Sequence, residues 1–399
     1  MKILVIASNF PNQFYPTIAP WSKLQVDSIK QNTKIDIEVL APRPFVIPLK
    51  YFPFNEFSHL PDKEVSDTGY TIYHPYYPYL VPKKILFSLT GNTFSFFISR
   101  YIEKYLTRPD LIHARFGFLD GYGALEICQK WKIPLIFDVH GSRDFGEYLV
   151  SCMLKKKQQK TIHYARKILC VAEWQIKRGL EIGIPEEKLI CIPLGVDIEK
   201  FNPQQYKSIK KELGVDTEIV ILFVGQLIKR KSIDTLLQAL SKIDRSSQGK
   251  YKVFIIGGGP EKDNLKALSK KLNLCGYIEF LGKIPDEELT KWYSVADMFI
   301  LPSLSEGRPT VINEAMASEC AIIASNVSGI PEQVKNNHNG FLIEPQNVAE
   351  LKDRIQFLLD NPSELEKMKK NSRRRVIEEG WTWENYARKV TKIYCSLID

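Results

Sequence analysis

The sequence lacks an apolar run long enough to cross a bilayer. A spanning helix needs roughly 18–20 such residues, and the longest candidate, residues 85–98, is broken by Gly91-Asn92. The apolar start at residues 3–7 is too short for a secretion signal and leads directly into Asn9-Phe10-Pro11, so we expect a buried first strand there.

Disulfide and metal-binding patterns are missing as well. The seven cysteines are odd in number, scattered, and form no Cys-x-x-Cys pair, which argues against a disulfide framework and a zinc site. Such cysteine usage is typical of a reducing compartment, so we expect a cytoplasmic protein. No Asp-x-Asp element and no cluster of His, Asp and Glu at ligand spacing stands out, so the sequence indicates no metal and no cofactor.

Positive charge is in excess. The net charge is +9, and it divides into roughly +7 for residues 1–195 and roughly +2 for the remainder. Lys155, Lys156, Lys157 and Lys160 form one basic cluster, and residues 51–79 are rich in aromatic side chains. Two interpretations stay open: a solvated helix face, or attraction of a peripheral protein to the anionic inner surface of a membrane. Nucleic-acid binding is not expected, because no recognised motif accompanies the charge.

Short β-branched runs alternate with amphipathic helical patterns along the whole chain. The runs expected to be strands are residues 2–7, 35–41, 111–114, 134–139, 168–171, 189–192, 219–224, 252–257, 278–281, 297–301, 321–324 and 341–343. This alternation predicts an α/β fold with parallel sheets covered on both faces. Because it occurs twice, we expect two doubly wound domains, residues 1–195 and 196–382, and a final helix at 383–399. Residues 42–84, rich in Pro, Tyr and Phe, are expected to be an irregular excursion.

The strongest chemical signal lies in residues 301–317. This segment follows a buried strand and opens a helix, with Pro309 at a first-turn position. Backbone N–H groups at the start of that helix would be free to bind a phosphate or a sugar hydroxyl. Glu306 and Glu314 can each accept hydrogen bonds from two neighbouring hydroxyls of a sugar or a ribose. Alternatively, the two acids only complement the helix dipole.

Further segments extend this pattern. Glu306 and Glu314 are separated by seven residues that include Gly and Pro, and Ala-Met-Ala follows. The other segments are residues 192–201, 223–227 with Lys231, 280–289, 329–332 and 339–345, whereas residues 109–114 and 137–142 match more loosely. Together they resemble the retaining glycosyltransferases of family 4, almost continuously over residues 165–385.

The resemblance implies a GT-B fold, in which two Rossmann-like domains face each other across a cleft and the final helix packs back on the first domain. It implies transfer of a sugar from a nucleotide-diphosphate sugar, held by the C-terminal domain, to an acceptor hydroxyl at the N-terminal domain. The acceptor would be a saccharide or a lipid-linked molecule in polysaccharide or glycolipid biosynthesis. Family chemistry retains the anomeric configuration without a metal, because positioned cations and amides stabilise the leaving diphosphate.

The resemblance also places the site residues. The positions that match donor-binding positions of the family are Gly225, Gln226, Lys231, Ile284, Glu306, Gly307, Arg308, Pro309, Thr310 and Glu314. Glu306 and Lys231 are further expected to be catalytic, together with His140, which follows a strand of the first half and would contact the transferred sugar. His113 is more simply explained by packing.

Two positions depart from the family pattern. Residues 17–21, Thr-Ile-Ala-Pro-Trp, stand where the family has a Gly-Gly turn near the donor phosphates, and they are not expected to form that turn. Gln226 stands where Arg is usual, so a charge-assisted hydrogen bond is lost. Lys231 then carries more of the phosphate binding, helped by Lys229 or Arg230, unless the three cations are only a charged helix start.

Other functions stay open on sequence grounds. A nucleotide-sugar epimerase or a phosphorylase uses the same architecture. A non-catalytic nucleotide-sugar-binding protein would account for both departures. A dinucleotide-dependent oxidoreductase is not expected, because Gly257-Gly258-Gly259-Pro260 has the wrong spacing and position for that fingerprint, and we interpret it as a tight turn.

Overall fold

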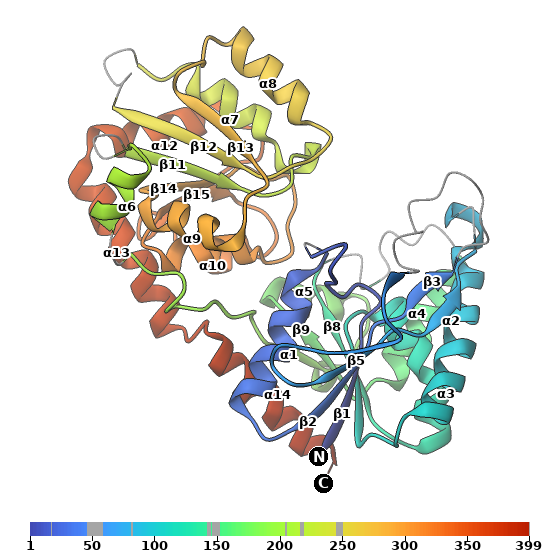
Figure 1. Cartoon of the computed structure of the whole chain (residues 1–399). Coiled ribbons are helices and arrows are strands. Elements are labelled where there is room, and N and C mark those ends of the chain that lie inside the picture. Colours follow the sequence, from blue (N-terminus) through green and yellow to red (C-terminus); the bar gives the residue numbers. More distant parts are fainter. Residues whose placement is uncertain are drawn as a thin grey trace. The chain divides into compact units, whose positions relative to one another are not determined.

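The computed structural model describes residues 1–16, 18–45, 59–80, 83–141, 145, 152–203, 206–215, 219–244 and 250–398. The chain divides into two compact units (Figure 1). Unit 1 comprises Met1–Leu194 and Trp383–Asp399, and unit 2 comprises Gly195–Thr382. The division proposed from the sequence, between residues 195 and 196, lies one residue from this boundary.

Unit 1 is built on an eight-stranded sheet in the order β10-β9-β8-β7-β1-β2-β5-β4, parallel except for β4, which pairs antiparallel with β5. The strands are β1 (Lys2–Ile6), β2 (Asp36–Leu40), β4 (Lys63–Val65), β5 (Thr71–Tyr73), β7 (Leu111–Ala114), β8 (Leu135–Val139), β9 (Lys167–Cys170) and β10 (Leu189–Cys191). Because the chain runs from β1 to one edge and later returns to the other side of β1, the sheet is doubly wound, with its switch point between β1 and β7.

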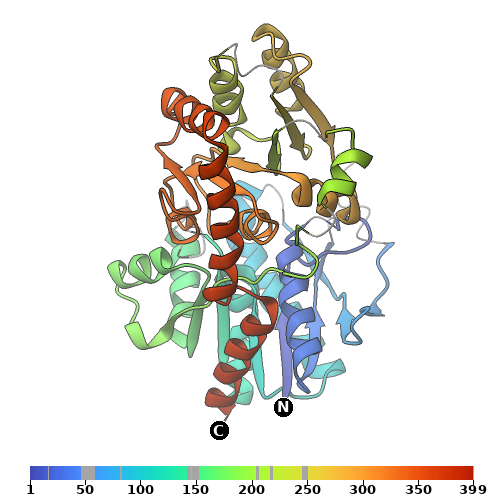
Figure 2. The ribbon, with the colours of Figure 1, turned by 90° about the vertical axis from the view of Figure 1, so that its left-hand side faces the viewer.

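Side chains of β1 alternate between two cores because successive residues of a strand point to opposite faces. Ile3 and Val5 share a core with α1 (Pro20–Asn32) and α14 (Trp383–Ile398), which lie side by side in Figure 2. Leu4 and Ile6 share the other core with α2 (Lys83–Tyr105) and α3 (Tyr122–Trp131). The final helix therefore packs on unit 1, as the family resemblance implied.

The face of the sheet that carries α2 and α3 also carries α4 (Cys152–Tyr164) and α5 (Glu173–Glu181), since residues 162 and 176 pack against the same core.

The interpretation of residues 42–84 as irregular was wrong where the structure describes them. They contain β4 and β5, and also β3 (Arg43–Phe45) and β6 (Tyr76–Pro78), which form a small parallel sheet. Three-residue strands are too short to give a readable alternation pattern. Residues 46–58 and 81–82 lie outside the described part.

Unit 2 has one six-stranded parallel sheet in the order β13-β12-β11-β14-β15-β16. Its strands are β11 (Ile219–Val224), β12 (Tyr251–Ile256), β13 (Ile278–Gly282), β14 (Met298–Leu301), β15 (Ala321–Ser325) and β16 (Gly340–Ile343). Its helices are α6 (Tyr206–Glu212), α7 (Ile233–Leu240), α8 (Lys262–Lys271), α9 (Asp286–Val295), α10 (Thr310–Ala317), α11 (Ile330–Gln333), α12 (Val348–Asp360) and α13 (Pro362–Glu378). This is again a doubly wound sheet, and its switch point lies between β11 and β14.

None of the helices in the described ranges has the length and hydropathy needed to span a bilayer. None of the seven cysteines, all of which lie in the described ranges, forms a disulfide bond. Both units are Rossmann-like α/β domains, so the predicted fold class is confirmed. Each expected strand of residues 219–343 is present, because its apolar residues are buried on both faces of a parallel sheet.

Candidate active site

The carboxyl ends of β11 and β14 define the candidate site of unit 2. These strands are neighbours on either side of the switch point, where ligands of open α/β sheets bind. Gly225 and Gln226 follow β11 directly, and residues 302–309 connect β14 to α10. The structure thus brings two of the predicted donor-binding segments to one edge of one sheet.

Lys231 and Glu306 form an ion pair at this edge. The Lys231 Nζ atom donates to Glu306 Oε1 at 2.6 Å, and the two side chains are only 11% and 7% exposed. Burial by itself would raise the pKa of Glu306, but the cations of Lys231 and Arg230 outweigh burial and lower the pKa. Glu306 is therefore ionised at neutral pH, and its charge is matched by a cation that still reaches the surface.

Arg230 ties the two connections together. Its NH1 atom lies 3.1 Å from Glu306 Oε2 and also donates to the carbonyl of Ser305. The Arg230 carbonyl accepts from the backbone N–H of Leu304 at 2.8 Å. Because side chain and backbone both bridge the loops, Glu306 is held in one position before any ligand arrives. The sequence suggested that Lys229 or Arg230 helps Lys231 to bind phosphate. Arg230 lies beside the pair of Lys231 and Glu306, whereas Lys229 is exposed.

The start of α10 adjoins this pair. Pro309 is the N-cap, one residue earlier than the first-turn position predicted, and α10 begins at Thr310 with no side-chain cap. The first N–H groups of a helix have no partner within the helix, so this end favours an anion. The Gly307 carbonyl accepts from Gly329 N at 3.0 Å, and the Pro309 carbonyl from Gln333 Nε2 at 3.0 Å. These bonds fix the loop that carries Glu306.

Gly225 brings the end of β11 against Lys231. A Cβ atom at Gly225 would lie 3.6 Å from Lys231 Cε, and Gly225 N donates to the carbonyl of Ile256 at 3.0 Å. The triple glycine that follows β12 packs against the same loop. A Cβ at Gly257 would lie 1.8 Å from the Gly225 carbonyl oxygen, so only glycine fits there. The interpretation of this run as a tight turn is confirmed, since it connects β12 to α8.

The remaining predicted donor residues occupy three different settings. Glu314 is half-buried on α10, and burial raises its pKa to about 7. Gln226 is exposed and Ile284 is half-buried in the connection from β13 to α9. Arg308 is buried, and its guanidinium lies 4.3 Å above the indole ring of Trp381. This stacking gives Arg308 a packing role within unit 2 that the sequence did not reveal.

His140 belongs to unit 1, where it follows β8. Its ring lies 3.7 Å from that of Trp21, with Phe116 at 5.7 Å and Asp138 Oδ2 3.8 Å from its Nε2 atom. Burial lowers the pKa of His140 to about 4, against the opposing pull of Asp138. The imidazole is therefore neutral at physiological pH, so it can form hydrogen bonds with hydroxyls but carries no charge.

Sequence reasoning missed a buried polar network beside His140. Asp138 Oδ1 accepts from His113 Nε2 at 2.8 Å, and Asp138 Oδ2 accepts from Arg115 NH1 at 2.7 Å. The other ring nitrogen of His113 lies 2.7 Å from the hydroxyl of Tyr394 on α14. His113 is 0% exposed, so its packing role is confirmed. No spacing rule links residues that are 23 to 281 positions apart, so the polar residues at the strand ends were the sole indication of this network in the sequence.

Residues 17–21, which stand where the family has a Gly-Gly turn, cover the end of the connection from β1 and the start of α1. Thr17 lies outside the described residues, but Ala19 precedes α1 in the left-handed conformation, with φ 42° and ψ 54°. Glycine favours this region and alanine does not. At the switch point itself, Ser8 N donates to Asp120 Oδ1 at 2.9 Å, and burial raises the pKa of Asp120 to about 7.

Comparisons with known structures identify the class of fold. A sucrose-phosphate synthase from Thermosynechococcus elongatus superposes with a TM-score of 0.80 at 21% identity, over 99% of this chain and 98% of the other. HepE of Anabaena, solved with UDP-glucose, gives a TM-score of 0.73 at 17% identity over the whole of both chains. The fold is therefore the GT-B fold of glycosyltransferases.

Sequence comparisons identify the family. The model of the glycosyl transferases group 1 matches residues 205–375, and that of glycosyltransferase family 4 matches residues 55–200. An uncharacterised glycosyltransferase of Methanocaldococcus jannaschii is 30% identical over 324 residues, 76% of this chain and 80% of the relative. A Bacillus subtilis protein assigned to teichuronic acid biosynthesis, TuaC, is 27% identical over 362 residues, 89% of this chain and 88% of the relative. The chain belongs to glycosyltransferase family 4.

Proposed function

We propose that this enzyme transfers a sugar from a nucleoside-diphosphate sugar to an acceptor hydroxyl, and that the donor binds at the β11–β14 edge of unit 2. The observation that carries the proposal is the ion pair of Lys231 and Glu306 beside the start of α10. A fixed cation and a helix N-terminus at one sheet edge suit a diphosphate. HepE, with the same fold, is solved with UDP-glucose, which supports this donor class.

Each site residue has a distinct role in this proposal. Lys231 neutralises the charge that develops on the leaving diphosphate. Glu306 orients Lys231 and accepts hydrogen bonds from the donor sugar, while Glu314, on the first turns of α10, accepts from the ribose hydroxyls. His140 contacts the transferred sugar as a neutral imidazole. Gln226 adds an uncharged hydrogen bond to a phosphate.

The reaction proceeds with retention and without a metal. Both carboxylate oxygens of Glu306 already accept from Lys231 and Arg230, which supports cationic side chains as the stabilisers of the leaving group. No side chain is assigned as a base, because on the retaining route a donor phosphate oxygen takes the acceptor proton. The similarity to TuaC supports a saccharide or lipid-linked acceptor in polysaccharide or glycolipid biosynthesis.

The direct test is a panel of nucleoside-diphosphate sugars incubated with the purified enzyme and a lipid or saccharide acceptor, with excess EDTA. We expect release of the nucleoside diphosphate from one donor class, undiminished by the chelator, and a product with the donor's anomeric configuration by NMR. Binding without release would favour a non-catalytic protein, and conversion of the donor sugar without transfer would favour an epimerase. A strict requirement for magnesium or manganese would contradict the metal-free mechanism.

A further inference from the structure

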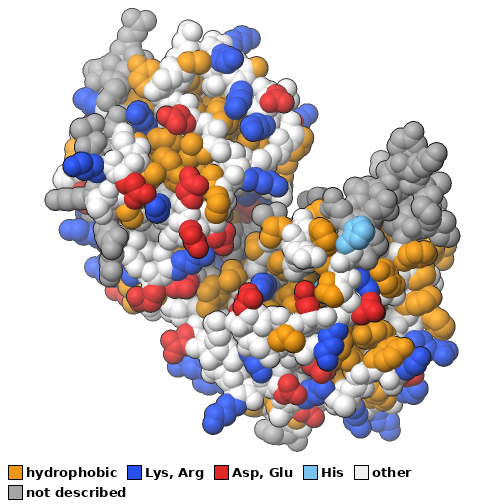
Figure 3. Space-filling model, viewed as in Figure 1, with side chains coloured by type: hydrophobic (Ala, Val, Ile, Leu, Met, Phe, Trp, Pro, Cys, Tyr) orange, Lys and Arg blue, Asp and Glu red, His pale blue; other side chains and the backbone are white. Residues whose placement is uncertain are grey.

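One helix of unit 1 is apolar on both sides. On its inner side α2 buries Phe94, Ile98 and Ile102 completely. On its outer side Phe96 is 49% exposed and Phe97 is 42% exposed. A surface helix normally presents polar residues to water, so folding does not explain why two phenylalanines stand outward. Figure 3 shows apolar side chains gathered over the α2 side of unit 1, interspersed with basic ones.

Cations flank the exposed aromatic rings of α2. The Arg100 guanidinium lies 4.9 Å from the centre of the Phe96 ring, and Lys104 Nζ lies 4.9 Å from that of Tyr105. Long basic side chains can lie along apolar surface and keep their charge at its margin. The arrangement places exposed aromatic rings beside cations on the same helix.

The basic cluster on α4 lies on the same side of the sheet. Lys155, Lys156 and Lys160 are exposed, but Lys157 is turned inward and donates to Asn92 Oδ1 at 2.6 Å. The expectation that all four lysines share one outer face was therefore wrong for Lys157. Its ammonium lies 5.0 Å from the ring of Tyr122, so it ties α4 to α2 and α3.

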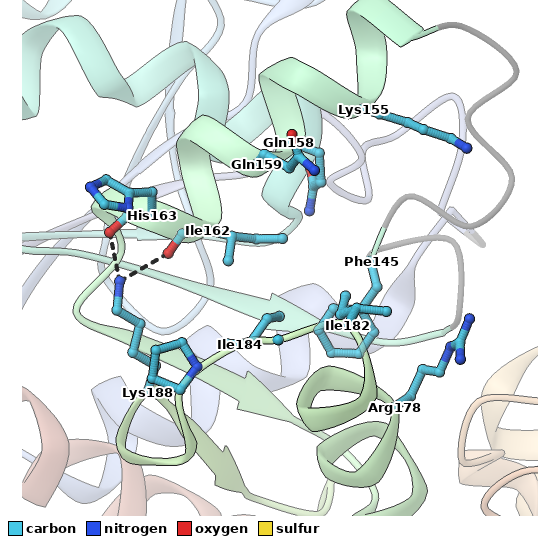
Figure 4. Close-up of a pocket in the computed structure, with 12 residues that line it drawn as sticks. Phe145, Lys155, Gln158, Gln159, Ile162, His163, Arg178, Ile182, Ile184 and Lys188 are labelled. Carbon is cyan, nitrogen blue, oxygen red and sulfur yellow. Dashed lines mark hydrogen bonds between the residues drawn. The ribbon is translucent and has the colours of Figure 1, made fainter.

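Two hollows flank α4, and lysines of α4 contribute to the lining of both. A groove of about 710 Å³ is lined by Ser95 of α2, Tyr122 of α3, and Lys156 and Lys160 of α4. On the other flank a cavity of about 700 Å³ has Lys155 in its lining (Figure 4). There Lys188 donates to the carbonyls of Ile162 and His163 at 3.1 and 2.6 Å, so internal bonds already hold that cavity together.

The charge of this helix layer is strongly one-sided. Helix α2 has four basic residues and one acidic, α3 has one of each, and α4 has four basic and none acidic. The acidic residue of α2, Glu103, is paired with Lys130 of α3 at 2.7 Å. Lysine is depleted in protein–protein interfaces, whereas anionic lipid attracts lysine and arginine in any arrangement.

We propose that the outer face of α2, α3 and α4 docks on an anionic lipid bilayer. Phe96 and Phe97 enter the boundary between headgroups and acyl chains, and exposed lysines of α4 and α2 contact the headgroups. These lysines are Lys155, Lys156 and Lys160 of α4 and Lys104 of α2. The inference rests on the proposed function in one respect, because a docked enzyme acts on an acceptor carried by that bilayer. The docking surface contains none of the residues assigned to donor binding or catalysis.

The test is co-sedimentation with vesicles of phosphatidylcholine alone or with 30 mol% phosphatidylglycerol, roughly the regime of anionic cell membranes. One variant changes Lys155, Lys156 and Lys160 to Gln, and a second is Phe96→Ser with Phe97→Ser. Matched controls remove the same number of charges and a similar apolar area elsewhere. They are Lys266, Lys270 and Lys271 to Gln on α8, and Phe357→Ser with Ile377→Ser on unit 2, all at exposed positions.

We expect wild type to bind the anionic vesicles and to be released by salt, since exposed charges are screened beyond about 8–10 Å. The lysine variant should lose about 100-fold in partitioning, roughly fivefold for each cation removed, and the phenylalanine variant about tenfold or more. Both controls should bind like wild type. Equal loss in the α8 control, no preference for anionic vesicles, or self-association through Phe96 and Phe97 would each overturn the proposal.

Donor turnover separates this proposal from the proposed function. The docking variants should release nucleoside diphosphate from the donor at the wild-type rate with a soluble acceptor, and lose activity only with vesicle-borne acceptor. Normal vesicle binding by a chain that turns over no donor would instead refute the proposed function and leave the docking surface standing.

Discussion

Both units have charged side chains at the ends of their strands, but these side chains are more exposed in unit 2 than in unit 1. In unit 2 the site cations reach the surface: the Arg230 side chain is 44% exposed, and that of Lys231 is 11% exposed beside Glu306. In unit 1, Arg115 and Asp138 are 0% and 2% exposed. The Asp138 network continues to α14 through Tyr394 and through Gln25, which donates to Tyr386 at 2.6 Å.

The difference shows which charges bind ligands and which hold the fold. A buried ion pair that loses one partner leaves an uncompensated charge in the interior. In unit 2 the pair of Lys231 and Glu306 borders the surface, and Arg230, which is 44% exposed, stays beside Glu306 when Lys231 is removed, so breaking the pair costs the fold less. We therefore expect substitutions in unit 1 to appear in stability, and the equivalent substitutions in unit 2 to appear in turnover.

The largest effect should come from Asp138→Asn. The variant keeps the shape of the side chain but leaves Arg115 buried without its counter-charge, so unfolding free energy should fall by about 3–5 kcal/mol. Thermal unfolding followed by circular dichroism measures the loss, with Glu306→Gln as the matched control, expected to lose less stability because its amide oxygen still accepts from Lys231 and Arg230 is exposed. If Asp138→Asn is as stable as the control, the network does not anchor α14.

In unit 2 we expect the opposite result, a loss of turnover without a loss of stability. Lys231→Ala should lower turnover about 100- to 1000-fold, the scale for removing one positioned stabiliser of developing charge, while thermal stability stays near that of wild type. Lys229→Ala is the control, because Lys229 is an exposed cation two residues away. Similar losses in both variants would mean that only the general positive field matters.

These contrasts mark the limit of sequence reasoning. The site residues of unit 2 were predictable because many of them lie close together in the sequence, as Glu306 and Glu314 do, so a short motif identifies them. The partnership of Lys231 with Glu306 could not be derived from spacing, because the two residues are 75 positions apart and come together only where β11 pairs with β14. The contact of Arg308 with Trp381 could not be derived either, since it depends on the packing of distant segments.

Unit 1 was less readable for two physical reasons. Its additional strands β3 to β6 have only three residues each, too few for alternation to be recognised. Its polar network joins Gln25, His113, Asp138 and Tyr394, and nothing in their local sequence distinguishes them from packing residues. The burial of Lys157 was likewise not predicted. Neighbouring residues of a helix point in different directions, so one of the four lysines of α4 faces inward while the other three are exposed.

A smaller effect should separate the two carboxylates of unit 2 by pH. Because burial raises the pKa of Glu314 to about 7, its ionised, hydroxyl-accepting form is lost as pH falls through 7. Nucleotide affinity should rise about tenfold between pH 6 and pH 8, as the ionised fraction does. The Glu314→Gln variant should bind more weakly and show no such rise, which calorimetry at both pH values checks. His140, already neutral over this range, should leave the profile unchanged.

The raised pKa of Glu314 also affects stability. Nucleotide affinity should rise with pH, whereas the contribution of Glu314 to folding stability should fall. The folded-state pKa of Glu314 lies above the ordinary value of 4.5, so the folded state binds its proton more tightly than the unfolded state does. That contribution is complete below about pH 4.5 and is lost as pH rises to about 7. Wild type should therefore lose more stability than Glu314→Gln between pH 5 and pH 8. An equal loss in both proteins would contradict the assignment.

The smallest effect tests the irregular start of α1. Replacing Ala19 by Gly relieves a left-handed conformation that costs an alanine about 1–2 kcal/mol, but glycine gains about 0.5–1 kcal/mol of unfolded-state freedom. The net expectation is a stabilisation of between zero and about 1.5 kcal/mol. Ala172→Gly is the control, because Ala172 precedes α5 in an extended conformation, with φ −154°. That variant should be destabilised, and stabilisation by both changes would refute the strain.

The most direct test of the central claim is calorimetric titration of a nucleoside diphosphate into wild type, Lys231→Ala and His140→Ala. The account predicts that wild type binds one nucleoside diphosphate and that Lys231→Ala weakens binding at least tenfold. His140→Ala, in the other unit, should keep wild-type affinity while transfer falls. Wild-type affinity in Lys231→Ala, or loss of affinity confined to His140→Ala, would contradict a donor site at the β11–β14 edge.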